Sequence, residues 1–166
     1  MTEEKGRQKL VLISVFDKTG IVEFARSLVE LGWAIISSGG TAKKLAEADV
    51  PVTDVAELVG GGAILGHRVV TLSREVHAGL LADLNNPDQV KELADLEIPL
   101  IDMVVCDFYP MADMIAKPGV TVEQVVEMTD IGGPTMVRSA AKGNRIVVCR
   151  AQERGIDLKQ LQENGD

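Results

Sequence analysis

The sequence predicts an α/β fold in which helices cover a mainly parallel sheet. Short apolar runs at residues 10–15 and 101–106 suit strands that are buried on both faces. Segments in which apolar residues recur at helical spacing follow such runs, so strands and helices alternate along the chain. This alternation is typical of a parallel sheet with helical connections.

The first part of the chain alternates regularly. The strand at 10–15 is followed by apolar residues at helical spacing over residues 21–29. A second strand is predicted at 33–36, a short helix at 42–48 and a third strand at 51–55. We expect these strands to lie parallel in one sheet.

The pattern becomes less regular over residues 57–81, where a Gly-rich segment indicates a mobile or functional insertion. No repeat, low-complexity tract or linker divides the chain, so we expect one domain over residues 1–166. The remaining predicted elements are a strand at 68–72, a helical turn at 76–81, a helix starting at Asn86-Pro87, strands at 101–106 and 145–149, a helix with a capping box formed by Thr121 and Gln124, a helix starting at Pro134 and a terminal helix at 155–163.

The charge balance argues against nucleic acid as a partner. The chain has 17 Lys and Arg against 25 Asp and Glu, a net charge of −8, and only 3% aromatic residues. It therefore offers neither a basic surface for phosphate backbones nor a set of rings for stacking on bases. A small anionic substrate is still compatible with this charge, because a pocket can gather cations locally.

Targeting and redox features favour a cytoplasmic protein. The first residues lack the apolar core of a signal peptide, and no stretch reaches the roughly 18 apolar residues of a membrane span. Cys106 and Cys149 each end an apolar run and do not form a Cys-x-x-Cys pair. We expect buried free thiols in a reducing compartment, and no membrane partner.

Two turns after predicted strands carry residues suited to phosphate binding. The segment Ser38–Thr41 lies where a buried strand turns into a helix, so hydroxyl groups and backbone amides can converge on one anion. Ser14 and Lys18 flank the corresponding turn after the first strand, and parallel strands place such turns at one ligand-binding edge. The alternative is an ordinary turn in which Ser38 or Thr41 only caps the helix.

A third candidate group spans residues 130–142. Gly132-Gly133 let the backbone approach a ligand, and a helix starting at Pro134 would present amide donors to an anion. Asp130 would lie at the mouth of this turn, while Arg138 and Lys142 would share one helix face. The alternative is a solvated cationic helix face without a ligand.

Tyr109 and the two histidines complete the candidates. Tyr109 follows a predicted strand, where its phenol can donate a proton or bind a substrate; closing the sheet edge is the alternative. His67 and His77 lie ten residues apart with no cysteine or paired carboxylate nearby, which argues against a zinc site. We predict no bound metal.

Several motifs occur in order along nearly the whole chain, at residues 14–20, 38–42, 76–79, 106–110 and 130–133, the last with 140–142. Together they resemble the IMP cyclohydrolase domain of the bifunctional purine-biosynthesis enzyme. The resemblance implies a methylglyoxal-synthase-like three-layer α/β fold and the last step of IMP formation. In that step the carboxamide nitrogen of FAICAR attacks the formyl carbon of the same molecule and water leaves, with no metal or other cofactor.

The resemblance also implies the partners. The substrate is FAICAR, the product is IMP, and the protein is expected to form a homodimer. No segment here matches the AICAR formyltransferase half of the bifunctional enzyme, so we expect a freestanding cyclohydrolase that works with a separate formyltransferase.

Individual roles follow from the same resemblance. Asp130, Lys142 and Tyr109 match the catalytic aspartate, lysine and tyrosine. Asp130 is expected to help deprotonate the amide, while Lys142 and Tyr109 stabilise and protonate the formyl oxygen. The residues implied in binding the substrate and its phosphate are Ser14, Lys18, Ser38, Gly39, Gly40, Thr41, Arg68, Thr71, Asp107, Ile131, Gly132 and Gly133.

The chain departs from the family pattern mainly in one loop. Val70 stands where the family has an active-site lysine, and Ser73-Arg74 stands where it has His-Pro; elsewhere, Asp107 replaces the usual asparagine. Arg74 or His67 is the candidate for restoring the lost charge. Loss of the lysine favours a second interpretation, a non-catalytic regulatory module that binds purine nucleotides. A third, a methylglyoxal synthase, would need a different set of carboxylates.

Overall fold

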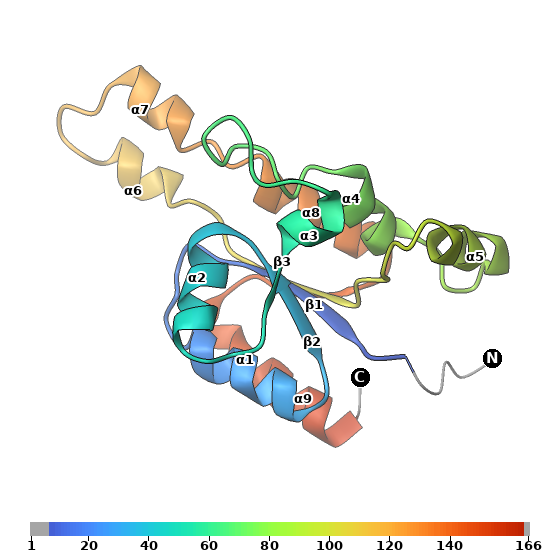
Figure 1. The fold of residues 1–166 in the computed structure, drawn as a ribbon. Coiled ribbons are helices and arrows are strands. Elements are labelled where there is room, and N and C mark those ends of the chain that lie inside the picture. The colour runs from blue at the N-terminus through green and yellow to red at the C-terminus, as the bar shows by residue number, and fades with distance from the viewer. Residues whose placement is uncertain (1–6, 165–166) are drawn as a thin grey trace.

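The computed structural model describes residues 7–164 and contains one sheet of five parallel strands in the order β3-β2-β1-β4-β5 (Figure 1). The predicted α/β class with a parallel sheet is therefore confirmed. The strands are β1 (Leu10–Ser14), β2 (Ala34–Ser37), β3 (Thr53–Asp54), β4 (Met103–Cys106) and β5 (Ile146–Val148).

Helices cover both faces of the sheet and make a three-layer arrangement (Figure 1). On one face lie α1 (Ile21–Glu30), α2 (Gly39–Glu47) and α9 (Arg154–Asn164), and on the other lie α3 (Val55–Val59), α4 (Arg74–Leu81) and α8 (Gly132–Lys142). The remaining helical segments are α5 (Pro87–Asp95), α6 (Met111–Ile115), α7 (Val122–Glu127) and the 3-10 turn η1 (Ala151–Glu153).

The core explains why the strands are continuous apolar runs. In β1, Val11 and Ile13 pack with α1, α2 and α9, whereas Leu10 and Leu12 pack with α3, α4 and α8. Successive side chains of a strand point to opposite faces, and here each face is covered by helices. Burial on both faces therefore favours apolar residues at nearly every position, and the buried Ser37 of β2 satisfies its hydroxyl by donating to the Ile13 carbonyl.

Two predicted strands differ in the structure. Residues 68–72 form turns and bends, with one bridge between Ile64 and Val69, because the chain reverses over 65–68 and no strand lies alongside. The predicted strand at 51–55 is reduced to β3, because the Asp54 side chain accepts a hydrogen bond from the Ala56 amide and starts α3.

The helices also differ in part from the prediction. The capping box of Thr121 and Gln124 is confirmed at the start of α7. In contrast, α8 begins at Gly132 rather than at Pro134, which occupies its third position, where the missing N–H is tolerated. Helices α3 and α6 were not predicted. Cys106 is buried as expected, but Cys149 is partly exposed.

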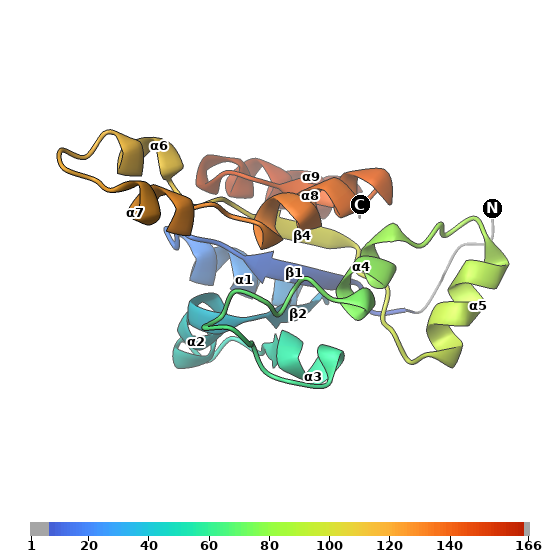
Figure 2. The same ribbon diagram turned by 90° about the horizontal axis from the view of Figure 1, so that it is seen from above.

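Helices α6 and α7 project from the body of the molecule on the side opposite α5 (Figure 2). They follow β4, so they extend beyond the edge where the parallel strands have their carboxyl ends. Among residues 7–164, no helix has both the length and the apolar composition needed to cross a lipid bilayer.

A partly buried histidine joins two helices of one layer. His77 Nδ1 lies 2.8 Å from Ser139 Oγ, linking α4 to α8, while Nε2 is buried without a hydrogen-bond partner among the described residues. Burial lowers the pKa of His77 below its ordinary value of 6.5. In the unfolded chain this histidine gains a proton near pH 6.5, but in the folded chain it stays neutral to a lower pH.

We therefore expect the stability of the fold to fall as the pH drops below about 6.5, because the unfolded state then binds more protons. Unfolding temperatures of the wild type and of His77→Gln, measured between pH 5 and 8, test this expectation. The variant should show a smaller loss on the acid side. His67→Gln, at an exposed turn, is the matched control, and an identical pH profile for both variants would contradict the assignment.

Candidate active site

The carboxyl edge of the sheet brings most of the predicted residues together. β1 lies beside β4, but the chain leaves β1 toward β2 on one side and leaves β4 toward β5 on the other. In open α/β sheets, ligands bind at the crevice formed where the strand order reverses in this way. The loops after β1, β2 and β4 all open onto this edge.

The turn between β2 and α2 lies next to the loop after β1. Gly39 has a φ of +55°, a left-handed conformation that favours glycine and turns the chain sharply into α2. A side chain at Gly40 would contact Lys18, whose Cε lies 3.7 Å from the position of such a Cβ. The ammonium of Lys18 donates to the carbonyl of Val15 at 3.0 Å. A cation therefore stands beside the first turn of a helix, an arrangement suited to an anion.

The hydroxyl groups of this turn have different surroundings. Thr41 is buried, and its Oγ1 donates to the Val15 carbonyl at 3.1 Å, so it ties α2 to the loop after β1. Ser38 occupies the N-cap position of α2, but within the described residues its side chain makes no capping bond. The simple capping alternative is therefore not what this turn shows. Ser14 is half-buried at the end of β1.

A second turn, at residues 130–133, carries the predicted catalytic carboxylate. Asp130 Oδ1 accepts a hydrogen bond from the Gly133 amide at 2.9 Å. The expected free donors of this helix start are thus partly used by the protein's own carboxylate. A Cβ at Gly132 would lie 3.0 Å from Thr71 Oγ1, which places Thr71 beside the turn. Ile131 is exposed at the N-cap of α8.

The Asp130 turn packs tightly against the end of β4. A Cβ at Gly133 would lie 2.7 Å from Asp130 Oδ2, 3.0 Å from the Phe108 ring and 3.1 Å from Cys106 Sγ. Burial raises the pKa of the Cys106 thiol far above its ordinary value, and the nearby charge of Asp130 adds to this effect. Cys106 is therefore a packing residue of the site and not a nucleophile.

Tyr109 lies in the loop after β4 with 48% of its surface exposed. Its ring meets that of Phe16, from the loop after β1, at 5.7 Å between centroids in an edge-to-face contact. Phe108, its neighbour in the chain, packs on the Asp130 turn, so the loop that carries Tyr109 lies against that turn. The structure thus brings Tyr109 and Asp130 to the same edge.

Lys142 is not brought to this turn. It is the exposed last residue of α8, whereas Asp130 precedes the first. At the usual helical rise, Gly132 and Lys142 lie about 15 Å apart along the axis. The two ends of the predicted motif therefore occupy opposite ends of one helix.

Residues 67–74 form the loop in which the sequence departs from the family pattern, and the cationic side chains of this loop are exposed. Arg68 forms an ion pair with Glu127 of α7, and both side chains are largely exposed. Arg74 pairs with its neighbour Glu75 at 3.1 Å, and His67 lies exposed in a turn. Val70 packs against the core on the α3, α4 and α8 face. Arg74 and His67 are thus exposed, and Arg74 already has an acidic partner.

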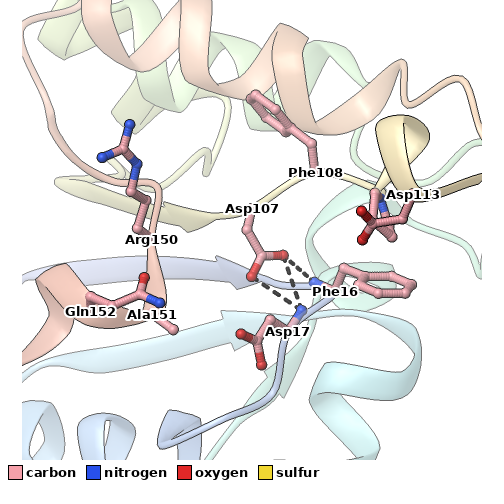
Figure 3. Close-up of a pocket in the computed structure, with 9 residues that line it drawn as sticks. Phe16, Asp17, Asp107, Phe108, Asp113, Arg150, Ala151 and Gln152 are labelled. Carbon is pink, nitrogen blue, oxygen red and sulfur yellow. Dashed lines mark hydrogen bonds between the residues drawn. The ribbon is translucent and has the colours of Figure 1, made fainter. Parts of the chain in front are cut away.

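Asp107 serves the fold rather than an open phosphate site. Its Oδ1 accepts from the Phe16 amide and its Oδ2 accepts from the Asp17 amide at 3.1 Å, so it joins the loops after β4 and β1 (Figure 3). It also lines an open pocket of about 400 Å³ with Phe16, Asp17, Phe108, Pro110, Asp113, Arg150, Ala151 and Gln152. Of the residues predicted from the sequence, only Asp107 lines this pocket.

A family model described as the MGS-like domain matches residues 20–135, which is more than half of the chain. The chain belongs to the MGS-like domain family. The crystal structure of ForH is similar to this MGS-like domain, with 32% sequence identity and a TM-score of 0.82, over 96% of this chain and 82% of ForH. The predicted three-layer fold of this family is thereby shown.

Sequence reasoning missed two residues of this MGS-like domain. Phe16 contacts Tyr109, but a phenylalanine before a charged loop gives no signal of such a contact. Arg154 is buried and donates to a carbonyl of the loop after β1, but it lies outside every motif recognised in the sequence. Both were visible only once elements distant in sequence had been placed side by side.

Proposed function

We propose that this MGS-like domain is an IMP cyclohydrolase, a cyclic amidine hydrolase that closes the purine ring of FAICAR to give IMP and water. The observation that carries the proposal is that two turns lie at the same edge of the sheet. One holds Lys18 beside Gly40, suited to a phosphate, and the other holds Asp130 against the loop that carries Tyr109, suited to proton transfer. The resemblance of both turns to the cyclohydrolase motifs supports the assignment.

In the proposed reaction, Asp130 accepts a proton from the carboxamide nitrogen as that nitrogen attacks the formyl carbon. A carbon–nitrogen bond forms, and the formyl oxygen takes a proton from Tyr109 to become a hydroxyl group. This hydroxyl then takes the proton from Asp130 and leaves as water, while the former formamido nitrogen gives up its proton to Tyr109 and the ring C=N bond forms, so both side chains return to their starting states. Binding both reacting groups in one geometry supplies a large part of the acceleration. Lys142, at the far end of α8, is left out of this scheme.

Lys18→Met is expected to weaken IMP binding about tenfold, because a charge-assisted contact to the phosphate is lost. The measurement is the dissociation constant of IMP by calorimetry. Lys91→Met is the matched control, since Lys91 is an exposed lysine of α5 on the opposite side of the molecule. Equal affinity of the Lys18 variant and the wild type would argue against phosphate binding at this turn.

Two observations favour a second candidate, a regulatory module that binds purine nucleotides without turning them over. Val70, in place of the family lysine, packs against the core. Lys142 is far from Asp130 along α8. The two cations that the resemblance implies, the loop lysine and Lys142, are therefore not available at the Asp130 turn.

The deciding experiment measures IMP formation from FAICAR by the purified protein against a no-protein control, together with IMP binding. Turnover above the control supports the cyclohydrolase. Binding without turnover supports the regulatory module. If the protein neither binds IMP nor forms it, both proposals fail and only the assignment of the fold remains. We also propose a homodimer and a separate AICAR formyltransferase as the source of FAICAR, which sedimentation analysis and a coupled assay can check.

A further inference from the structure

Arg154, the first residue of α9, is a buried cation directed at the loop after β1. Its side chain is 5% exposed. Nη1 donates to the carbonyl oxygen of Thr19, and Nη2 donates to that of Asp17 at 3.0 Å. Burial lowers the pKa of this guanidinium, while the carboxylates of Asp107 and Asp17 oppose the decrease. Arg154 therefore uses its planar fork to hold two carbonyl groups of one loop.

Asp107 holds the same loop through its amides. It accepts from the backbone N–H groups of Phe16 and Asp17, and its Oδ2 lies 3.6 Å from Arg154 Nη2. Residues 16–19 are thus held by two side chains, a donor from α9 and an acceptor from the end of β4. We call this pair the Arg154–Asp107 clasp.

Lys18 lies within the gripped segment. Asp17 and Thr19, on either side of it, are the residues whose carbonyl groups Arg154 binds. Its own ammonium turns back to the Val15 and Phe16 carbonyls and stands beside Gly40. The backbone positions that aim Lys18 are therefore set by two residues that are distant in sequence.

Stability alone does not account for a buried charge at this position. Burying an ion pair costs desolvation free energy, and apolar side chains of similar volume often stabilise a fold as well or better. Arg154 Nε is also buried without a hydrogen-bond partner among the described residues, which adds to that cost. The buried guanidinium instead fixes the backbone geometry of the loop after β1.

We propose that Arg154 is a positioning residue for the phosphate loop, holding residues 16–19 with Asp107 so that Lys18 faces the first turn of α2. The identity of the ligand rests on the proposed function, whereas the inference that Arg154 and Asp107 order the loop does not. Arg154 lies outside residues 20–135, so the loop is held by a residue that the family match does not cover.

The test combines Arg154→Met with Lys18→Met in a double-mutant cycle on IMP affinity. Arg154→Met is expected to weaken IMP binding about tenfold in the wild type and less than about twofold in Lys18→Met, because its effect passes through Lys18. Its effect on thermal stability, of either sign, should be the same in both backgrounds. Arg26→Met is the matched control, since Arg26 also donates to a carbonyl, that of Ala48, away from the loop.

Hydrogen exchange of the amides at residues 16–19 gives a second readout that needs no ligand. Exchange there should be faster in Arg154→Met and intermediate in Arg154→Lys, which keeps the charge but not the fork. Arg154→Lys also carries the affinity test if Arg154→Met does not fold.

Wild-type affinity in the Arg154 variants, an equal loss in both backgrounds of the cycle, or unchanged exchange at residues 16–19 would each overturn the proposal. If the wild type binds no IMP, the proposed function fails, and the exchange measurement alone then decides whether the clasp holds the loop.

Discussion

Asp130→Asn is expected to abolish IMP formation while leaving the fold intact. An asparagine Oδ1 can still accept the hydrogen bond that the Gly133 amide donates to Asp130 Oδ1 at 2.9 Å, so the turn keeps its shape. The amide cannot take a proton from the carboxamide nitrogen. Loss of a positioned general base typically lowers a rate by about 10²–10⁴-fold, which would bring turnover close to the no-protein control.

The measurement is the rate of IMP formation at saturating FAICAR, with the unfolding temperature as a check on the fold. Asp113→Asn is the matched control, because Asp113 is an exposed carboxylate of α6 near the same edge and takes no part in the proposed reaction. Wild-type turnover in Asp130→Asn would remove Asp130 from the mechanism. A lower rate in both variants would point to a general electrostatic effect.

Gly133→Ala is expected to damage both stability and activity. An added Cβ would lie 2.7 Å from Asp130 Oδ2 and 3.0–3.1 Å from Phe108 and Cys106, distances that the packed turn cannot accept without moving. Overpacking of this kind costs about 1–3 kcal/mol of unfolding free energy. The nearest atom belongs to the carboxylate, so the shift displaces the proposed base.

The unfolding free energy from urea denaturation and the rate of IMP formation test this expectation together. Gly62→Ala provides the control, since a Cβ there meets open space. A Gly133→Ala protein with full activity would show that Asp130 need not be held where the turn places it. Loss of stability with full activity would separate the packing role of Gly133 from catalysis.

The order of strands and helices could be predicted to a large extent because it rests on local properties. A strand buried on both faces is largely apolar, as β1 up to Ile13 and β4 are, and such a run is visible in the sequence. Caps are equally local, as with Thr121 and Gln124 in α7. Residues 68–72 misled the prediction, because β-branched residues favour a strand only where a neighbouring strand is present.

The candidate site could be predicted only in outline. Because parallel strands end at one edge, the sequence indicated that Lys18, the turn at 38–41 and Tyr109 would gather there, and the resemblance added Asp130 to them. The 12-residue separation of Asp130 and Lys142, however, was interpreted as one site, whereas α8 places them at its opposite ends.

The amino-acid sequence by itself determined the α/β class, the buried strands and the turns that follow them, since each depends on neighbours within a few positions. Only the tertiary structure decided which partner each charge takes. Asp107 binds the loop of Phe16 and Arg154, and Arg68 pairs with Glu127. The reason is physical: a hydrogen bond or ion pair depends on ångström distances between side chains far apart in the chain, and local patterns carry no record of those distances.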